Sequence, residues 1–304
     1  MHIIVIGADG RLANAFAHAA VAAGHRVTGV TRSGRMCHPV EGVAVRAADA
    51  MDREALVAAC ADADMVFNGV NPPYPAWAKA AMPMAENVVA ACRAANARML
   101  FPGNVYNFGE GMPECLTPDT PPRPTTRKGR IRVEMEALFE RSGGDVTVLR
   151  AGDFYGGPVP GSWFDLMVAK DVGAGKFTYP GPTDRVHAWA YLPDLAAAFV
   201  RLAEADLPGF RTYGFEGHTM TGAEMRAGLE KAASRPLRTK GVPWRLLRVV
   251  GLLQPMMREV SEMEYLWRVP HHLDGAALEK AIGVVPHTPR DEALATALAD
   301  LPRP

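Results

Sequence analysis

Residues 2–13 decide the fold, and they read HIIVIGADGRLA. The β-branched run at residues 2–6 predicts a buried strand, and the Ala-rich residues 12–24 that follow predict a helix. Between them, Gly7 permits a tight turn, and Gly10 lets backbone N–H groups approach a pyrophosphate at the positively polarised helix N-terminus. A merely structural turn is the alternative. Glycines at this spacing in the first strand–helix turn favour a dinucleotide site.

Strands and helices alternate through the following residues, as is typical of βαβ units and a parallel sheet. The predicted strands are residues 26–30, 43–46, 65–67, 98–101 and 146–150, and the predicted helices are residues 52–60, 83–95, 128–141 and 193–205. We predict an α/β fold, a doubly wound (Rossmann) parallel sheet over residues 1–155 that is completed by about 186–215. Residues 156–185 and 216–304 would form a smaller, mixed substrate-binding domain.

Composition and charge exclude several classes of protein. Hydrophobic residues make up 48% of the chain and charged residues 22%, which is ordinary for a globular protein and excludes disorder. The 33 basic and 33 acidic residues balance without a basic block, so we expect no nucleic-acid partner. No apolar run reaches the ~20 residues that span a bilayer, so we expect no membrane partner. The 4 cysteines are scattered, which suggests reduced thiols and a cytoplasmic location.

The end of the second predicted strand bears on cofactor choice. A carboxylate there would accept the ribose hydroxyls of NAD and repel a 2′-phosphate. This chain has no acid at that point and instead carries Arg32, whose guanidinium can contact a phosphate. We therefore expect NADP(H) rather than NAD(H). Alternatively, Arg32 and Arg35 are solvated turn residues.

Three further segments carry a family resemblance. Residues 116–124 read LTPDTPPRP, residues 149–156 read LRAGDFYG, and residues 273–298 combine Leu-Asp, Gly and Thr-Pro at characteristic intervals. With the GxxGxxA turn at residues 7–13, these segments resemble the NAD-dependent epimerase/dehydratase family, the extended short-chain dehydrogenases/reductases. The resemblance covers nearly the whole length. Together with the reasoning on Arg32 and the cationic Lys128, it predicts that the cofactor is bound by Gly7, Asp9, Gly10, Arg11, Leu12, Arg32, Asp49, Asn68, Gly69, Val70, Gly103, Lys128, Gly152 and Phe154.

The positions that match the family's catalytic residues carry other side chains. The family presents a Ser or Thr together with a Tyr-xxx-Lys pair, in which the Tyr transfers a proton to or from the substrate oxygen. Here Pro102 stands at the Ser/Thr position, Lys128 replaces the tyrosine and Arg132 replaces the lysine. The hydroxyl-based proton relay of the family is therefore absent.

The replacements allow several roles. Lys128 and Arg132 are four residues apart on one predicted helix and so share a face. Lys128 would act as a general acid if burial and nearby cations favour its neutral form; it could instead bind an anion or be solvated. Arg132 would hold ribose hydroxyls. Asn104 would donate its amide to a substrate carbonyl, and Tyr106 would pack beneath the pocket.

Two histidine-containing segments are secondary candidates. His187, Trp189 and Tyr191 alternate as on one face of a strand, so they line either a pocket or the core. His271 and His272 have no third partner at metal-ligand spacing, so we expect a surface pair and no metal site.

These observations favour an atypical NAD(P)-dependent oxidoreductase that acts on a small carbonyl or hydroxyl substrate. One alternative is a catalytically silent NADP(H)-binding regulator, which the missing relay favours. Another is a nucleotide-sugar epimerase or dehydratase, or a binder of sugar nucleotides without a redox role. By analogy with the family, residues 82–95 and 128–141 could pair across a homodimer.

Overall fold

A seven-stranded sheet forms the centre of the molecule in a computed structural model that describes residues 1–301. In sheet order the strands are β11 (Phe210–Gly214), β7 (Val146–Arg150), β5 (Arg98–Gly103), β4 (Met65–Asn68), β1 (His2–Ile6), β2 (Arg26–Thr31) and β3 (Val43–Ala47). All neighbouring strands run parallel. The chain passes from β1 to β2 and β3 on one side, whereas β4 lies on the other side. Ligands of open α/β sheets bind at the carboxyl ends of the strands at such a reversal.

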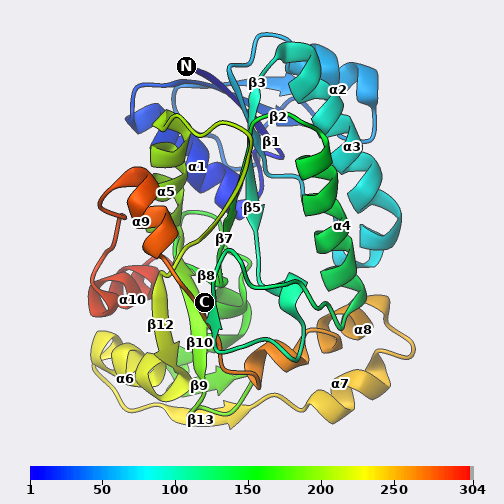
Figure 1. The fold of residues 1–304 in the computed structure, drawn as a ribbon. Helices are drawn as coiled ribbons and strands as arrows, with labels where there is room; N and C mark the ends of the chain where they lie inside the picture. The colour runs from blue at the N-terminus through cyan, green and yellow to red at the C-terminus, as the bar shows by residue number, and fades with distance from the viewer. Residues whose placement is uncertain (302–304) are drawn as a thin grey trace.

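Helices cover both faces of this sheet (Figure 1). One face carries α1 (Arg11–Ala22), α5 (Leu192–Glu204) and α9 (Ala276–Ile282), and the other carries α2 (Arg53–Ala59), α3 (Trp77–Ala95) and α4 (Arg127–Arg141). Phe16 of α1 and Phe199 of α5 pack against Phe67 of β4 on the first face. Phe101 of β5 packs against Phe139 of α4 on the second. The predicted α/β fold with a doubly wound sheet is confirmed.

Helix α3 differs from the sequence expectation. It begins at Trp77, so the predicted start at residue 83 is wrong, and Pro83 lies inside the helix. An interior proline removes one backbone hydrogen bond and costs about 3 kcal/mol. Burial of Trp77, Ala81 and Ala85 in the core offsets this cost.

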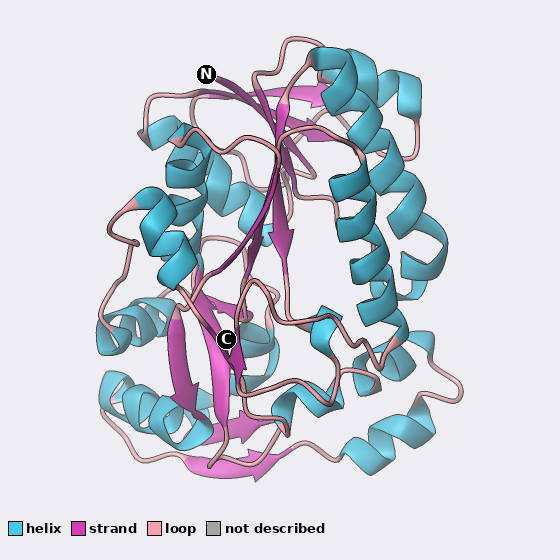
Figure 2. Cartoon of the chain, in the orientation of Figure 1, coloured by secondary structure: helices cyan, strands magenta, loops and turns pink. Residues whose placement is uncertain are grey.

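Three smaller sheets and further helices lie at the carboxyl ends of the large sheet (Figure 2). The first sheet contains β12 (His218–Thr221), β10 (Val186–Tyr191) and β8 (Asp153–Tyr155). The second pairs β13 (Arg238–Gly241) with β9 (Lys176–Tyr179), and the third pairs β14 (His272–Leu273) with β6 (Cys115–Leu116). The helices are α6 (Gly222–Ala233), α7 (Trp244–Val250), α8 (Pro255–Ser261) and α10 (Arg290–Ala299). The proposed division into two domains stays a prediction; α9, from the tail, packs against α5. Within residues 1–301, no helix has the length and apolar character needed to cross a membrane.

Candidate functional site

The glycine turn after β1 leaves room for a phosphate. Gly7 has a φ of +71°, which favours glycine, and a Cβ there would lie 2.9 Å from the carbonyl oxygen of Gly69. Gly10 precedes α1, and no side chain caps the first N–H groups of that helix. Uncapped N–H groups at a helix N-terminus bind anions. The residues present therefore fit the pyrophosphate of a dinucleotide.

A cavity of about 760 Å³ extends from this turn along the carboxyl ends of β4 and β5. Its volume is in the range of small-molecule and cofactor sites. Its outer wall comes from the C-terminal half, including Trp163, Leu247, Met256 and Met257. Of the predicted site residues, those that line the cavity are Gly10, Arg11, Leu12, Asn68, Gly69, Val70, Gly103, Asn104, Arg132, Gly152 and Phe154.

The other predicted cofactor residues are not among the lining residues of the cavity. Gly7 supports the turn, and the carboxylate of Asp9 accepts a hydrogen bond from the backbone N–H of Cys37 at 2.6 Å. Arg32 and Asp49 are both exposed. Arg32 directly follows β2, and Asp49 follows β3 by two residues. Their contact with a cofactor stays a prediction.

Arg11 connects the glycine turn to the loop that covers the opposite wall. Its Nε donates to the carbonyl oxygen of Val159 at 2.6 Å and its Nη2 to that of Gly156 at 3.0 Å. The same Nη2 lies 3.1 Å from a carboxylate oxygen of Asp165. Burial lowers the pKa of Arg11, although Asp165 opposes that effect. The guanidinium therefore ties two walls of the cavity together.

Arg132 is a buried cation that faces the cavity. Its guanidinium lies 5.0 Å from the ring centre of Trp77 and 5.1 Å from that of Phe101, and it donates to the carbonyl oxygen of Pro102 at 3.2 Å. Its Nε is buried and has no hydrogen-bond partner among residues 1–301. Burial lowers the pKa of this group. A buried unpaired donor is costly, so the Nε–H fits an acceptor such as a ribose hydroxyl.

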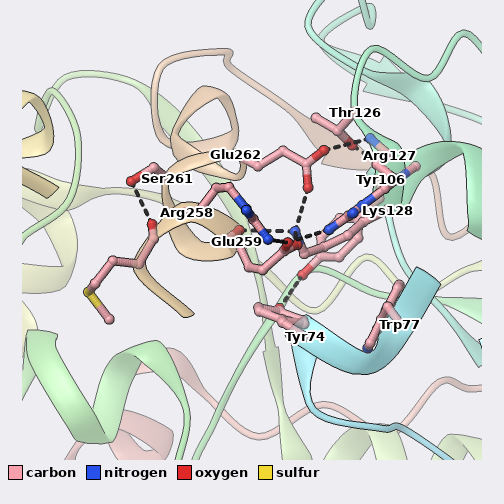
Figure 3. Close-up of polar contacts among 12 residues, drawn as sticks. Tyr74, Trp77, Tyr106, Thr126, Arg127, Lys128, Arg258, Glu259, Ser261 and Glu262 are labelled. Atoms are coloured by element: carbon pink, nitrogen blue, oxygen red, sulfur yellow. Dashed lines mark hydrogen bonds and ion pairs between the residues drawn. The ribbon is translucent and has the colours of Figure 1, made fainter. Parts of the chain in front are cut away.

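Lys128 lies in a buried ionic cluster and is not a lining residue of the cavity. Its Nζ lies 2.5 Å from Oε2 of Glu259 and 3.0 Å from the carbonyl oxygen of Glu259, and it pairs with Glu262 (Figure 3). The three ammonium donors therefore have three acceptors, all on or next to α8. Because the side chain is fully buried, the predicted alternative of a solvated helix face is wrong.

Arg127 completes this cluster. Its guanidinium pairs with Glu259, and its backbone N–H donates to Glu262 at 2.6 Å. Burial alone would raise the pKa of Glu259, but the hydrogen bonds from Lys128 and Arg127 outweigh burial and lower it. The cluster therefore holds α8 against the start of α4 as an ion-paired contact.

Two tyrosine hydroxyls face each other in the cavity wall. The hydroxyl oxygens of Tyr74 and Tyr106 lie 3.1 Å apart, and both residues line the cavity. Burial raises the pKa of both side chains, and that of Tyr106 is raised further by Tyr74. Asn104 lies beside them, with its side-chain oxygen accepting from the backbone N–H of Tyr106 at 3.0 Å. Tyr106 therefore lines the cavity rather than only packing beneath it.

The predicted surface pair of histidines is wrong for one member. His271 is buried and lines the cavity, and burial together with the neighbouring His187 lowers its pKa to about 3. His187 itself stacks on Trp267, and Trp189 belongs to the same buried cluster, so the alternating residues of β10 lie in the core. Residues 1–301 contain no group of three potential ligands that could hold a metal ion.

Comparison with known proteins identifies the family. A family model described as NAD(P)H-binding matches residues 7–175, which is more than half of the chain. The chain belongs to the NAD(P)H-binding family. The matched region contains the glycine turn, Asn104, Arg132 and the tyrosine pair. No curated protein matches the sequence.

Solved structures share the fold of this NAD(P)H-binding chain over its whole length. MoeE5 in complex with UDP-glucuronic acid and NAD has a TM-score of 0.79 at 16% identity, covering 99% of this chain and 98% of that one. UDP-glucose 4-epimerase from Bifidobacterium longum, in complex with NAD⁺ and UDP, has a TM-score of 0.77 at 18% identity, covering 98% and 97%. UDP-glucose 4-epimerase from Thermotoga maritima, with UDP-glucose, has a TM-score of 0.78 at 15% identity, covering 99% and 98%. The fold is of the epimerase/dehydratase type, as the resemblance predicted.

Sequence reasoning missed two parts of this NAD(P)H-binding site. Tyr74 follows β4 by six residues and therefore lies at the carboxyl edge of the sheet, a signal that the sequence did contain. Glu259, in contrast, meets Lys128 across 131 residues of sequence, and no local pattern marks that pairing.

Proposed function

We propose that this chain is an NAD(P)-dependent oxidoreductase that acts on a small carbonyl or hydroxyl substrate, with NADP(H) as its preferred cofactor. One observation carries the proposal. A single cavity connects the glycine turn to a group of hydrogen-bond donors formed by the buried Arg132 and the partly buried Asn104, Tyr74 and Tyr106. When bound, the nicotinamide cofactor would supply or accept the hydride.

The chain's own residues would position the two reactants. The N-terminus of α1 would hold the pyrophosphate, and the exposed Arg32 would contact a 2′-phosphate. The unpaired Nε–H of Arg132 would hold a ribose hydroxyl. Asn104 would donate its side-chain amide to the substrate oxygen, in place of the hydroxyl that Pro102 lacks.

We assign the proton at the substrate oxygen to the tyrosine pair. Burial raises the pKa of Tyr74 and Tyr106, so both hydroxyls stay protonated at neutral pH. One hydroxyl can donate to the substrate oxygen while it accepts a hydrogen bond from the other. As a carbonyl carbon gains hydride, its oxygen becomes a much stronger base than a tyrosinate and takes the proton. Lys128 is less suited to this step because its three donors already have acceptors on α8.

A thermal melt with NADP⁺, NADPH, NAD⁺ and NADH tests the cofactor first. A ligand at 100 times its dissociation constant stabilises by roughly 2.7 kcal/mol, which a melt detects readily. We expect larger shifts with the phosphorylated pair. Absence of a shift with all four nucleotides would end the proposal. A carbonyl panel, followed by nicotinamide absorbance, then tests turnover.

A second candidate is a catalytically silent NADP(H)-binding regulator. The observation that favours it is the engagement of Lys128, at the family's tyrosine position, in a buried ionic cluster. A nucleotide shift without turnover on any carbonyl would support the regulator. Stabilisation by UDP-sugars but not by nicotinamides would instead support a sugar-nucleotide binder.

A further inference from the structure

The segment from α6 to α8 carries a local excess of positive charge, although the whole chain is neutral. The chain has a formal net charge of zero, yet residues 231–258 contain seven basic residues and no acidic one. All seven side chains are exposed; they are Lys231, Arg235, Arg238, Lys240, Arg245, Arg248 and Arg258. The basic residues are spaced along the segment rather than joined in one run.

Few carboxylates neutralise this segment. Lys231 pairs with Asp291, Arg248 pairs with Glu264, and Arg258 lies 3.7 Å from Glu259. Arg238, Lys240 and Arg245 have no ion pair within residues 1–301. Figure 1 shows β13, α7 and α8 following one another along the lower edge of the molecule. The edge formed by β13, α7 and α8 therefore carries cationic side chains that have no ion-pair partner within residues 1–301.

Large apolar side chains are exposed on the same segment. Of nine exposed large apolar residues in the described chain, five lie between residues 246 and 256. The turn between α7 and α8 carries the most exposed of them, Leu252 at 83% and Leu253 at 90%. The other three are Leu246, Val249 and Met256. A concentration of exposed apolar side chains within eleven residues is typical of an interaction surface.

We propose that β13, α7 and α8 dock onto an anionic lipid bilayer surface. Aliphatic side chains that can enter the acyl boundary, interleaved with cations that contact lipid phosphates, are the composition of interfacial helices. A second copy of the chain would bring two unpaired cationic edges together, which charge repulsion opposes. A nucleic acid would pair with the cations but leave Leu252 and Leu253 in water.

The docking face adjoins the substrate cavity. Leu247 and Met257 line the cavity from α7 and α8, and the exposed Met256 of α8 lines it as well. The buried pair of Lys128 and Glu259 keeps α8 on the body of the protein. The sequence expectation of no membrane partner rested on the absence of a spanning segment, and a surface contact does not require one.

Vesicle flotation with the full chain tests this proposal. We expect flotation with vesicles of phosphatidylcholine and phosphatidylglycerol, weak flotation with phosphatidylcholine alone, and loss of binding as salt rises. The double substitution Leu252→Ser and Leu253→Ser should weaken partitioning about tenfold or more, because both side chains lose their apolar contact. Arg238→Gln with Arg245→Gln should weaken it to a similar extent and reduce its salt dependence.

Val284→Ser provides the matched control, because Val284 is 80% exposed but lies outside this segment. Its partitioning should equal that of the unaltered chain, and unchanged melting temperatures would show that all variants fold. Equal flotation on neutral and anionic vesicles would overturn the proposal. A dimer in light scattering that the double leucine substitution dissociates would also overturn it, in favour of a second copy. So would duplex DNA binding that displaces the vesicles and ignores the leucine substitutions.

Discussion

Nζ of Lys128 and Oε2 of Glu259 lie 2.5 Å apart, with both side chains almost fully removed from solvent. The first residue lies in the first turn of α4 and the second belongs to α8, 131 residues later. A buried ion pair gains little over apolar residues, but removing one partner leaves an uncompensated charge. The pair therefore fixes where α8 sits, at the wall of the cavity.

Loss of the lysine charge should destabilise the protein strongly. We expect Lys128→Met to lower the free energy of unfolding by about 3–5 kcal/mol, because Glu259 would remain buried without that partner. Adding Glu259→Gln should recover part of the loss. Lys231→Met is the control, since its ion pair with Asp291 is exposed and its loss should change little. Urea unfolding of the four proteins provides the comparison. Equal effects at Lys128 and Lys231 would contradict the buried-cluster model.

The same cluster should make stability depend on acid pH. The pKa of Glu259 is lowered from its ordinary value of 4.5, so the unfolded chain binds the proton more readily than the folded one. This contribution is present above the unfolded pKa and is lost as pH falls through the folded pKa. Unfolding should therefore be followed from neutral to acid pH for the unaltered chain and Glu259→Gln. The stability difference between them should shrink in acid, and a constant difference would refute this role.

A methyl group at Gly7 should damage nucleotide binding more than folding. An added Cβ would lie 2.9 Å from the carbonyl oxygen of Gly69, and the alanine would have to adopt a φ of +71°. We expect Gly7→Ala to destabilise by about 1–2 kcal/mol and to abolish the nucleotide-induced melting shift. Gly24→Ala separates the two effects, because Gly24 has a φ of +84° with nothing within 4 Å of its Cβ. That variant should lose stability but keep its nucleotide shift.

Arg32 should set the preference between the two nicotinamide cofactors. Replacement of Arg32 by Ala removes a charge-assisted phosphate contact, which is worth about 1.5–3 kcal/mol. We expect NADP⁺ affinity to fall by about tenfold or more and NAD⁺ affinity to change little, as titration calorimetry would measure. Arg35→Ala is the neighbouring exposed control and should leave both affinities unchanged. Equal losses for both cofactors would remove Arg32 from the 2′-phosphate site.

The tyrosine pair should act on turnover rather than on cofactor binding. Replacing Tyr106 or Tyr74 by Phe removes one hydroxyl, and we expect kcat to fall by about a hundredfold once a substrate is found. Tyr265→Phe is a suitable control, because its hydroxyl is buried, has no partner in residues 1–301 and is not a lining group of the cavity. An unaltered kcat in both the Tyr74 and the Tyr106 variant would show that another group transfers the proton.

The predictable parts of this protein are those encoded by neighbouring residues. Residues 2–13 predict a strand, a glycine turn and a helix, and the alternation of strands and helices after them predicts the parallel sheet. The tertiary contacts were not accessible in this way. His271 and His272 are adjacent and polar, so exposure was the natural expectation, yet packing buries the first beside His187. Lys128 acquired its environment from Glu259 and Glu262, far along the chain.

Arg11 has a consequence for the order and energetics of ligand binding. It begins α1 directly after the glycine turn, yet it bonds to Gly156 and Val159 of the loop across the cavity and to Asp165 just beyond that loop. A shift of that loop on contact with a substrate would strain or break bonds at the nucleotide turn. The two binding events would then share free energy. Thermodynamic linkage requires that whatever factor nucleotide imposes on substrate affinity, substrate imposes on nucleotide affinity.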